Sequence, residues 1–131
     1  MLAAASVFGL AWQRRNGRMR QPRPAAPGDG DRLTPAELGA PLGDRATLVQ
    51  FSSAFCAPCR ATRVILSDVA GMVDGVRHLE IDAESRLDLA GRLDIRRTPT
   101  VFVLGPDGRM VRRASGLPRK ADVIAALGEV G

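Results

Sequence analysis

Cysteine and histidine are scarce in this 131-residue chain, which has two cysteines, Cys56 and Cys59, and one histidine, His78. Two cysteines cannot build the multiple-disulfide scaffold that stabilises many small secreted proteins. A structural zinc site needs four ligands, and these three side chains leave it one short unless the chain dimerises or adds a carboxylate. A single histidine also gives no support for a Ser/His/Asp catalytic arrangement. The chemistry therefore concentrates on the cysteine pair.

The sequence also lacks internal repeats, a phosphate-binding loop and a dinucleotide-binding fingerprint. No acidic residue precedes Asp29, whereas five of the 19 basic residues do: Arg14, Arg15, Arg18, Arg20 and Arg23. From Asp29 onward the 14 remaining basic residues equal the 14 acidic ones in number. We therefore expect a nearly neutral folded part that carries no nucleic-acid-binding surface.

Residues 1–13 are uncharged and mostly apolar. As a helix they would extend about 20 Å, which is short of the roughly 30 Å hydrocarbon core of a membrane. Arginines follow this apolar run instead of preceding it, which argues against a secretory signal. We expect a short membrane anchor or the end of a membrane helix, with the domain on the cytoplasmic side because of the arginines. The alternatives are a solvated tail on a soluble cytoplasmic protein, or a domain on the extracytoplasmic face.

Residues 14–31 are rich in arginine, proline and glycine and show no periodicity, which predicts a linker before an ordered domain at 32–131. Within that domain the predicted strands are 46–51, 76–82, 100–104 and 110–115, and the predicted helices begin at Pro35, follow Cys56, and span 86–93 and 120–127. Strands that alternate with helices and end in a hairpin predict an α/β fold with a mixed sheet.

The spacing of apolar residues also predicts which face of each helix is buried. For the helix after the cysteines, the predicted buried residues are Ala61, Val64, Ile65, Val69 and Met72. For the last helix they are Val123, Ile124 and Leu127, with Val130 as a further candidate. Ser85 is predicted to cap the short helix at 86–93.

The pair Cys56 and Cys59 lies between a predicted strand and a predicted helix. The unpaired N–H groups of a helix N-terminus favour an anion, so they lower the pKa of a thiol placed there and make a nucleophilic thiolate available near neutral pH. The second sulfur lies about one helical turn away, close enough to form a disulfide. This arrangement is typical of thiol–disulfide exchange.

Three segments in register resemble the thioredoxin family. They are Cys56-Ala57-Pro58-Cys59 after a strand, Thr98-Pro99-Thr100 before the third strand, and Gly116 after the fourth. The resemblance covers about residues 32–130 and implies a thioredoxin-like fold, with a central mixed sheet of about four strands and flanking helices.

The resemblance also implies roles for individual residues. Cys56 would be the exposed nucleophile and Cys59 the buried resolving thiol. Phe55, Ala57 and Pro58 would form the active-site turn, in which the proline stiffens the chain. A cis Pro99, together with the backbone of Thr98, would hold an extended substrate strand beside Cys56.

Five positions depart from the family pattern. At about Val64 the helix proline of many members is replaced. Phe55 replaces the usual tryptophan, and Ala57 replaces the usual glycine. Gln50 stands where thioredoxins have a buried aspartate, and His78 stands where they have its lysine partner. A glutamine cannot accept the proton of Cys59, whereas a histidine can, so we treat Gln50 and His78 as a hypothetical proton relay. A half-buried histidine that is only hydrogen-bonded is the alternative.

These features predict a monomeric thiol–disulfide oxidoreductase that reduces protein or peptide disulfides without a bound cofactor and takes electrons from an unidentified donor. Two alternatives belong to other classes. One is a thioredoxin-fold module that binds a soft metal ion through both cysteines and an added ligand, and the other is a membrane-tethered adaptor without turnover. Arg60, Arg96 and Arg97 are expected around the site, where they lower the pKa of Cys56, attract acidic partners or only face solvent.

Overall fold

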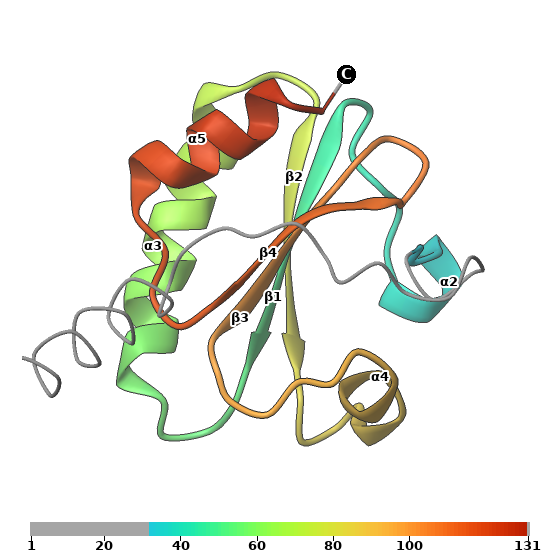
Figure 1. Cartoon of the computed structure of the whole chain (residues 1–131), viewed down its shortest axis with the longest axis vertical. Coiled ribbons are helices and arrows are strands. Elements are labelled where there is room, and N and C mark those ends of the chain that lie inside the picture. The colour runs from blue at the N-terminus through green and yellow to red at the C-terminus, as the bar shows by residue number, and fades with distance from the viewer. Residues whose placement is uncertain (1–31, 131) are drawn as a thin grey trace, which may run out of the picture.

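The structure, a computed structural model, describes residues 32–130 (Figure 1). The predicted anchor at 1–13 and the predicted linker at 14–31 lie outside the described residues. Along the chain the elements are α2 (Pro35–Leu38), β1 (Ala46–Ser52), α3 (Ala57–Met72), β2 (Val76–Asp82), α4 (Leu87–Arg92), β3 (Thr100–Leu104), β4 (Met110–Ser115) and α5 (Lys120–Gly128). Among the described residues, no helix is long and apolar enough to cross a membrane.

The four strands form one mixed sheet in the order β2-β1-β3-β4. β1 and β2 run parallel, whereas β3 is antiparallel to both β1 and β4. Figure 1 shows α3 and α5 on one side of this sheet and α2 and α4 on the other. The predicted α/β fold with a mixed sheet of four strands and flanking helices is confirmed.

All seven residues of the central strand β1 are buried, so side chains of other elements cover both of its faces. Leu48 packs in the cluster beneath α3 and α5, together with Val101 and Val103. Val49 and Phe51 pack in the cluster on the opposite face. Because successive side chains of a strand point to opposite faces, Gln50 follows Leu48 onto the α3 side of the sheet.

The predicted buried face of the helix after the cysteines is wrong at three positions, since Ala61, Val64 and Met72 of α3 are exposed. The exposed fractions of Val64 and Met72 are 57% and 61%. The buried residues of this helix are Cys59, Thr62, Leu66 and Val69, which recur at three- and four-residue steps. This helix has apolar residues on more than one face, and the face that carries Cys59 is the one that packs on the sheet.

Two smaller predictions also need correction. Arg86, not Ser85, is the N-cap of α4, and no side chain caps that helix. The Ser85 hydroxyl instead donates a hydrogen bond to Asp82 at the end of β2. Ile124 of α5 is 40% exposed, whereas its neighbour Val123 is fully buried as predicted.

The predicted start of α2 is confirmed in detail. The Thr34 hydroxyl accepts the backbone N–H of Glu37, and the Glu37 carboxylate accepts the backbone N–H of Thr34. This reciprocal capping box satisfies two donors that a helix N-terminus leaves unpaired. Arg92 of α4 forms an ion pair with the same carboxylate, so Glu37 joins the two helices on this side of the sheet.

Candidate active site

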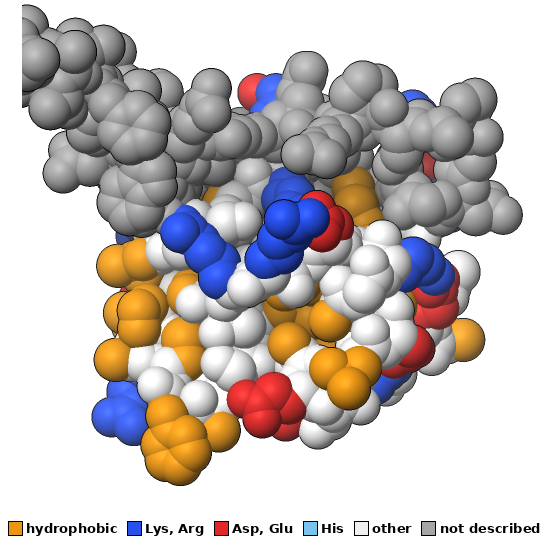
Figure 2. Space-filling view, turned by 60° about the horizontal axis from the view of Figure 1, so that its bottom comes forward, with side chains coloured by type: hydrophobic (Ala, Val, Ile, Leu, Met, Phe, Trp, Pro, Cys, Tyr) orange, Lys and Arg blue, Asp and Glu red, His pale blue; other side chains and the backbone are white. Residues whose placement is uncertain are grey.

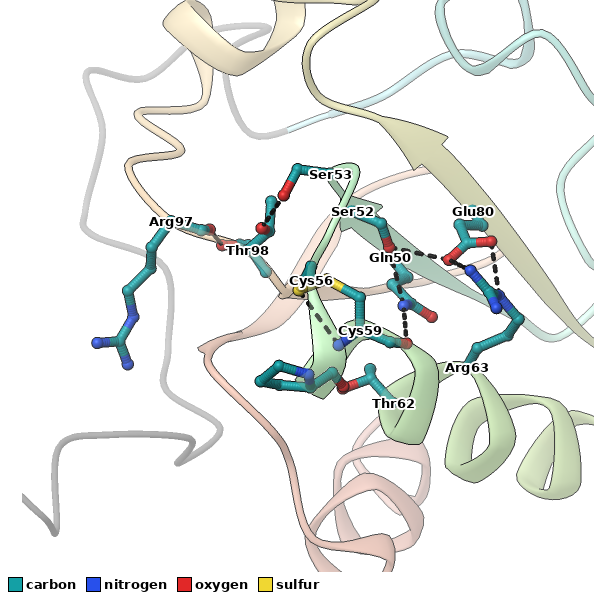
Figure 3. Close-up of a disulfide and its surroundings, with 12 residues drawn as sticks. Gln50, Ser52, Ser53, Cys56, Cys59, Thr62, Arg63, Glu80, Arg97 and Thr98 are labelled. Atoms are coloured by element: carbon teal, nitrogen blue, oxygen red, sulfur yellow. Dashed lines mark hydrogen bonds and ion pairs between the residues drawn. A yellow bond between two sulfur atoms is a disulfide. The ribbon is translucent and has the colours of Figure 1, made fainter.

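Cys56 and Cys59 form a disulfide where β1 gives way to α3 (Figure 3). Cys56 is the N-cap residue of α3, and its sulfur accepts the backbone N–H of Cys59 at 3.2 Å. Pro58 lies in the first turn, where a missing N–H costs the helix nothing. A negative charge on the Cys56 sulfur would be stabilised by this N–H and by the helix dipole.

The two sulfur-bearing residues differ in accessibility. Cys59 is 2% exposed, whereas Cys56 is only partly buried. Phe55, immediately before them, is fully exposed and has a positive φ of 62°. Figure 2 turns this end of the molecule toward the viewer and shows exposed apolar side chains on it. A partner can therefore reach Cys56 and Phe55 from solvent but not Cys59.

Thr98 and Pro99 lie in the loop that leads into β3. Figure 3 shows Thr98 near the disulfide. The peptide bond between Thr98 and Pro99 is cis. The hydroxyls of Thr98 and Ser53 are 2.6 Å apart, which ties this loop to the end of β1. The carbonyl of Pro99 accepts the backbone N–H of Gly116 at 2.7 Å, so all three segments noted in the sequence meet at one end of the sheet.

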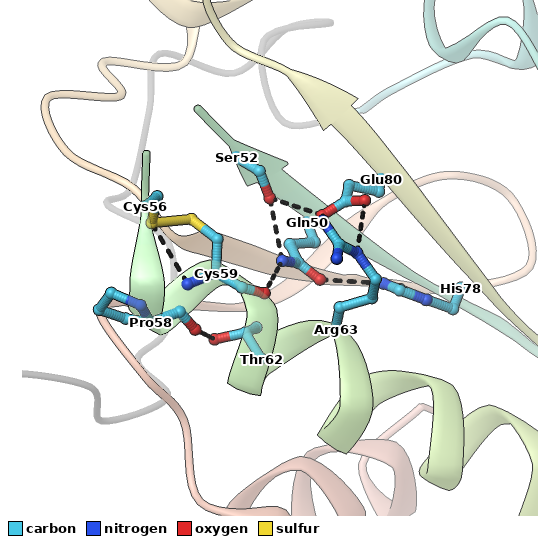
Figure 4. A network of polar contacts seen from close by, with 9 residues as sticks. All are labelled: Gln50, Ser52, Cys56, Pro58, Cys59, Thr62, Arg63, His78 and Glu80. Atoms are coloured by element: carbon cyan, nitrogen blue, oxygen red, sulfur yellow. Dashed lines mark hydrogen bonds and ion pairs between the residues drawn. A yellow bond between two sulfur atoms is a disulfide. The ribbon is translucent and has the colours of Figure 1, made fainter. Parts of the chain in front are cut away.

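Gln50 is fully buried behind the disulfide, and three hydrogen bonds hold its side chain (Figure 4). Its amide nitrogen donates to the carbonyl oxygen of Cys59 at 2.8 Å and to the hydroxyl of Ser52 at 2.9 Å. Its amide oxygen lies 3.1 Å from Nε2 of His78. The structure thus brings Gln50 and His78 together beside Cys59, and a proton relay through them stays a hypothesis.

His78 and Glu80 lie on β2 opposite Leu48 and Gln50 of β1. Burial lowers the pKa of His78 below its usual value; the charge of Glu80 opposes this effect and that of Arg63 adds to it. Histidine is therefore held in its neutral form over a wider pH range than in an unfolded chain.

The Glu80 carboxylate extends the network toward solvent. It accepts two hydrogen bonds from the Arg63 guanidinium, at 2.8 and 2.9 Å, and one from the Ser52 hydroxyl at 2.9 Å. Partial burial alone would raise the pKa of Glu80, but the hydrogen bonds from Arg63 and Ser52 outweigh it, so the net pKa is lowered. Glu80 is thus a carboxylate anion connected to the disulfide only through other side chains.

Four residues of the site were not predicted from the sequence: Ser52, Ser53, Arg63 and Glu80. Two of them follow from the alternation of side chains between the two faces of a strand. Ser52 lies two residues after Gln50 and Glu80 lies two residues after His78, so each shares a face of the sheet with a predicted site residue. Their meeting depends on the register that pairs Gln50 with Glu80 across β1 and β2, and this register is not visible in either strand alone.

The structure also bears on the metal-binding alternative and on the three arginines expected around the site. In residues 32–130 no group of three or more His, Cys, Asp or Glu side chains could hold a metal ion. Arg97 extends away from the disulfide, and its guanidinium donates to the carbonyl of Ser115 (Figure 3). Arg96 forms an exposed ion pair with Asp94, and Arg60 is exposed.

The sequence model of the family described as Thioredoxin matches residues 35–129. Thioredoxin H4-1 of Oryza sativa subsp. japonica is 31% identical over 84 residues, which are 63% of this chain and 63% of the relative. Thioredoxin of Gallus gallus is 31% identical over 81 residues, 62% of this chain and 75% of the relative. The chain thus spans less than two thirds of the length of the rice protein.

A solved structure of chloroplastic thioredoxin z superposes with a TM-score of 0.59 at 27% identity, covering 66% of this chain and 79% of that one. The matched region contains the disulfide, the segment around Pro99 and all four strands. With the family match extending over residues 35–129, these observations show that this chain belongs to the thioredoxin family.

Proposed function

We propose that this protein is a thiol–disulfide oxidoreductase that reduces disulfides of proteins or peptides. The observation that carries the proposal is the asymmetry of the pair: Cys56 is accessible at the N-terminus of α3, whereas Cys59 is buried directly behind it. Membership of the thioredoxin family supports the same activity.

The reaction starts from the dithiol. The Cys56 thiolate attacks one sulfur of the substrate disulfide; a bond forms between Cys56 and that sulfur, and the other substrate sulfur leaves as a thiolate. Cys59 then loses its proton and attacks the Cys56 sulfur. This step forms the Cys56–Cys59 disulfide and releases the second substrate thiolate. Two electrons have passed to the substrate, and an external dithiol must return the protein to its reduced form.

Thr98 and Pro99 are the residues proposed to hold the substrate. Thr98 lies near the disulfide, and the hydrogen bond between the Thr98 and Ser53 hydroxyls ties the loop that carries both residues to the end of β1. An extended substrate segment could pair with the backbone there and present its sulfur to Cys56. The exposed Phe55 ring would add apolar contact with the substrate.

Reduction of a model protein disulfide by the full chain, with dithiothreitol as electron donor, tests the activity. We expect a rate well above that of dithiothreitol alone, and no increase with the Cys56→Ser variant.

The reduction potential of the Cys56–Cys59 pair tests the direction of exchange: a value near −270 mV marks a reductant, whereas a value near −120 mV marks an oxidant. The proposal would be overturned if Cys56 and Cys59 formed no disulfide at any ratio of oxidised to reduced thiol buffer. Unchanged partner binding by a double serine variant would then support the adaptor alternative.

Membrane association with the domain on the cytoplasmic side is a second part of the proposal. It is supported by the apolar run at 1–13 and the five arginines that follow it. Fractionation of cells that express the full chain should place it with the membranes. Protease added from outside should leave the domain intact; trimming of the domain would instead place it on the outer face.

A further inference from the structure

In the polar network behind the disulfide, the donor and the acceptor of each hydrogen bond can be assigned. A carbonyl oxygen only accepts hydrogen bonds, so the Gln50 atom that faces the Cys59 carbonyl must be the amide nitrogen. Its second hydrogen goes to Ser52. The amide oxygen must then accept a hydrogen from Nε2 of His78. Gln50 therefore has one arrangement in which all its donors and acceptors are used.

Ser52 has a single hydrogen to donate. Because its oxygen already accepts from Gln50, this hydrogen goes to the Glu80 carboxylate. Glu80 accepts it as an anion, and its two bonds from Arg63 fix where its oxygens lie. A continuous chain thus runs from an ion pair that is partly exposed to solvent, through Ser52 and Gln50, to the backbone of Cys59 (Figure 4).

This chain ends on a carbonyl, not on a sulfur, and that determines what it can do. It anchors the first turn of α3 to β1. The same turn carries the Cys59 N–H, which points at the Cys56 sulfur. Any loosening of the turn weakens the N–H contact that would stabilise a Cys56 thiolate.

We propose that Glu80 is a positioning residue for the cysteine pair: with Arg63 as its counter-ion it orients Ser52, and through Ser52 and Gln50 it holds the Cys59 backbone against the Cys56 sulfur. The inference rests on the proposed function. It assigns a role in setting thiol reactivity to a carboxylate that contacts neither sulfur.

The test compares full-length wild type with Glu80→Gln. The introduced amide has no charge and only one acceptor oxygen, so it cannot hold Arg63 and Ser52 as the carboxylate does. The measurement is the rate at which iodoacetamide alkylates the reduced protein across a pH series. Trypsin cleavage at Arg45 and Arg60 places both cysteines in one peptide, and fragmentation of that peptide locates the label.

Glu37→Gln is the matched control. Like Glu80, Glu37 is a carboxylate paired with an arginine, and the exposed fractions of the two side chains are similar, 26% for Glu37 and 29% for Glu80. Glu37 instead joins α2 to α4 on the other side of the sheet. We expect Glu80→Gln to raise the pKa of Cys56 and to slow its alkylation near neutral pH roughly threefold, the effect of half a pKa unit. Glu37→Gln should leave both quantities unchanged.

Ser52→Ala provides a second variant should Glu80→Gln fold poorly, and Ser52→Thr, which keeps the hydroxyl, should restore the wild-type rate. Equal rates for wild type, Glu80→Gln and Ser52→Ala would overturn the inference, as would equal slowing by Glu37→Gln. Failure of the proposed function looks different: wild type itself would then alkylate no faster than a free thiol and would exchange no disulfide.

Discussion

The Nε2 atom of His78 lies 3.1 Å from the amide oxygen of Gln50, across the parallel pair of β1 and β2. Since the amide nitrogen of Gln50 faces the Cys59 carbonyl, the histidine donates this hydrogen bond and carries its proton on Nε2. A neutral imidazole is sufficient for that role. The pair therefore places two uncharged side chains behind the buried cysteine.

The free energy of unfolding should fall between about pH 7.5 and about pH 5.5. The pKa of His78 is lower in the folded protein than its usual value, so protons bind preferentially to the unfolded chain in this range. The loss should be modest, because His78 is only half-buried and the charge of Glu80 opposes the effect of burial on its pKa. Denaturant titrations at both pH values measure it.

His78→Asn is the control for this pH dependence, because His78 is the only histidine in the chain. The fall above about pH 5.5 should be much smaller in the variant. Glu80 and Glu37, whose pKa values are lowered, contribute stability that is lost only at more acidic pH. An equal fall in wild type and variant would show that another group titrates.

The Cys59→Ser variant should accumulate a mixed disulfide between Cys56 and a substrate. Its Cys56 can still attack, but no second thiol remains to release the product. Turnover should drop to the rate without enzyme, while non-reducing electrophoresis and intact mass show the covalent complex. Cys56→Ser should form no such complex; if it did, the buried Cys59 would have to be the attacking thiol.

Phe55→Ala should lower kcat/KM for protein disulfides by roughly tenfold, about 1.4 kcal/mol, because the fully exposed ring loses its contact with substrate. Stability should change by less than about 0.5 kcal/mol. Met72→Ala is the matched control, since Met72 is exposed at the far end of α3. Equal kcat/KM for the two variants would remove Phe55 from the substrate-binding surface.

Gly108→Ala should destabilise the protein by at least about 2 kcal/mol. Gly108 has a positive φ of 86°, and an added Cβ would lie 2.1 Å from the Leu33 carbonyl oxygen. Gly71→Ala, within α3 with no atom near the added Cβ, should instead stabilise by about 0.5–1 kcal/mol. Chemical denaturation of both variants measures the contrast, and a neutral Gly108→Ala would contradict the close approach of Leu33.

The sequence by itself determined the local features of this protein. The strand, the cysteine pair and the following helix were predictable, since Cys56 and Cys59 are three residues apart at a helix start and the strand before them is apolar. The hairpin between β3 and β4 was predictable from Gly105-Pro106-Asp107-Gly108. These features depend on neighbours along the chain, which a single sequence displays.

Tertiary structure alone decided which face of α3 is buried and what lies behind Cys59. Apolar residues occur on more than one face of that helix, so periodicity alone was compatible with burial of Val64 and Met72. In the structure Cys59 and Leu66 pack on the sheet, and this leaves Val64 and Met72 exposed. The contacts among Gln50, Ser52 and Glu80 require the register of a parallel strand pair separated by a whole helix. That register is set by burial across the entire sheet, because a shift of one residue would turn every side chain of a strand to the wrong face.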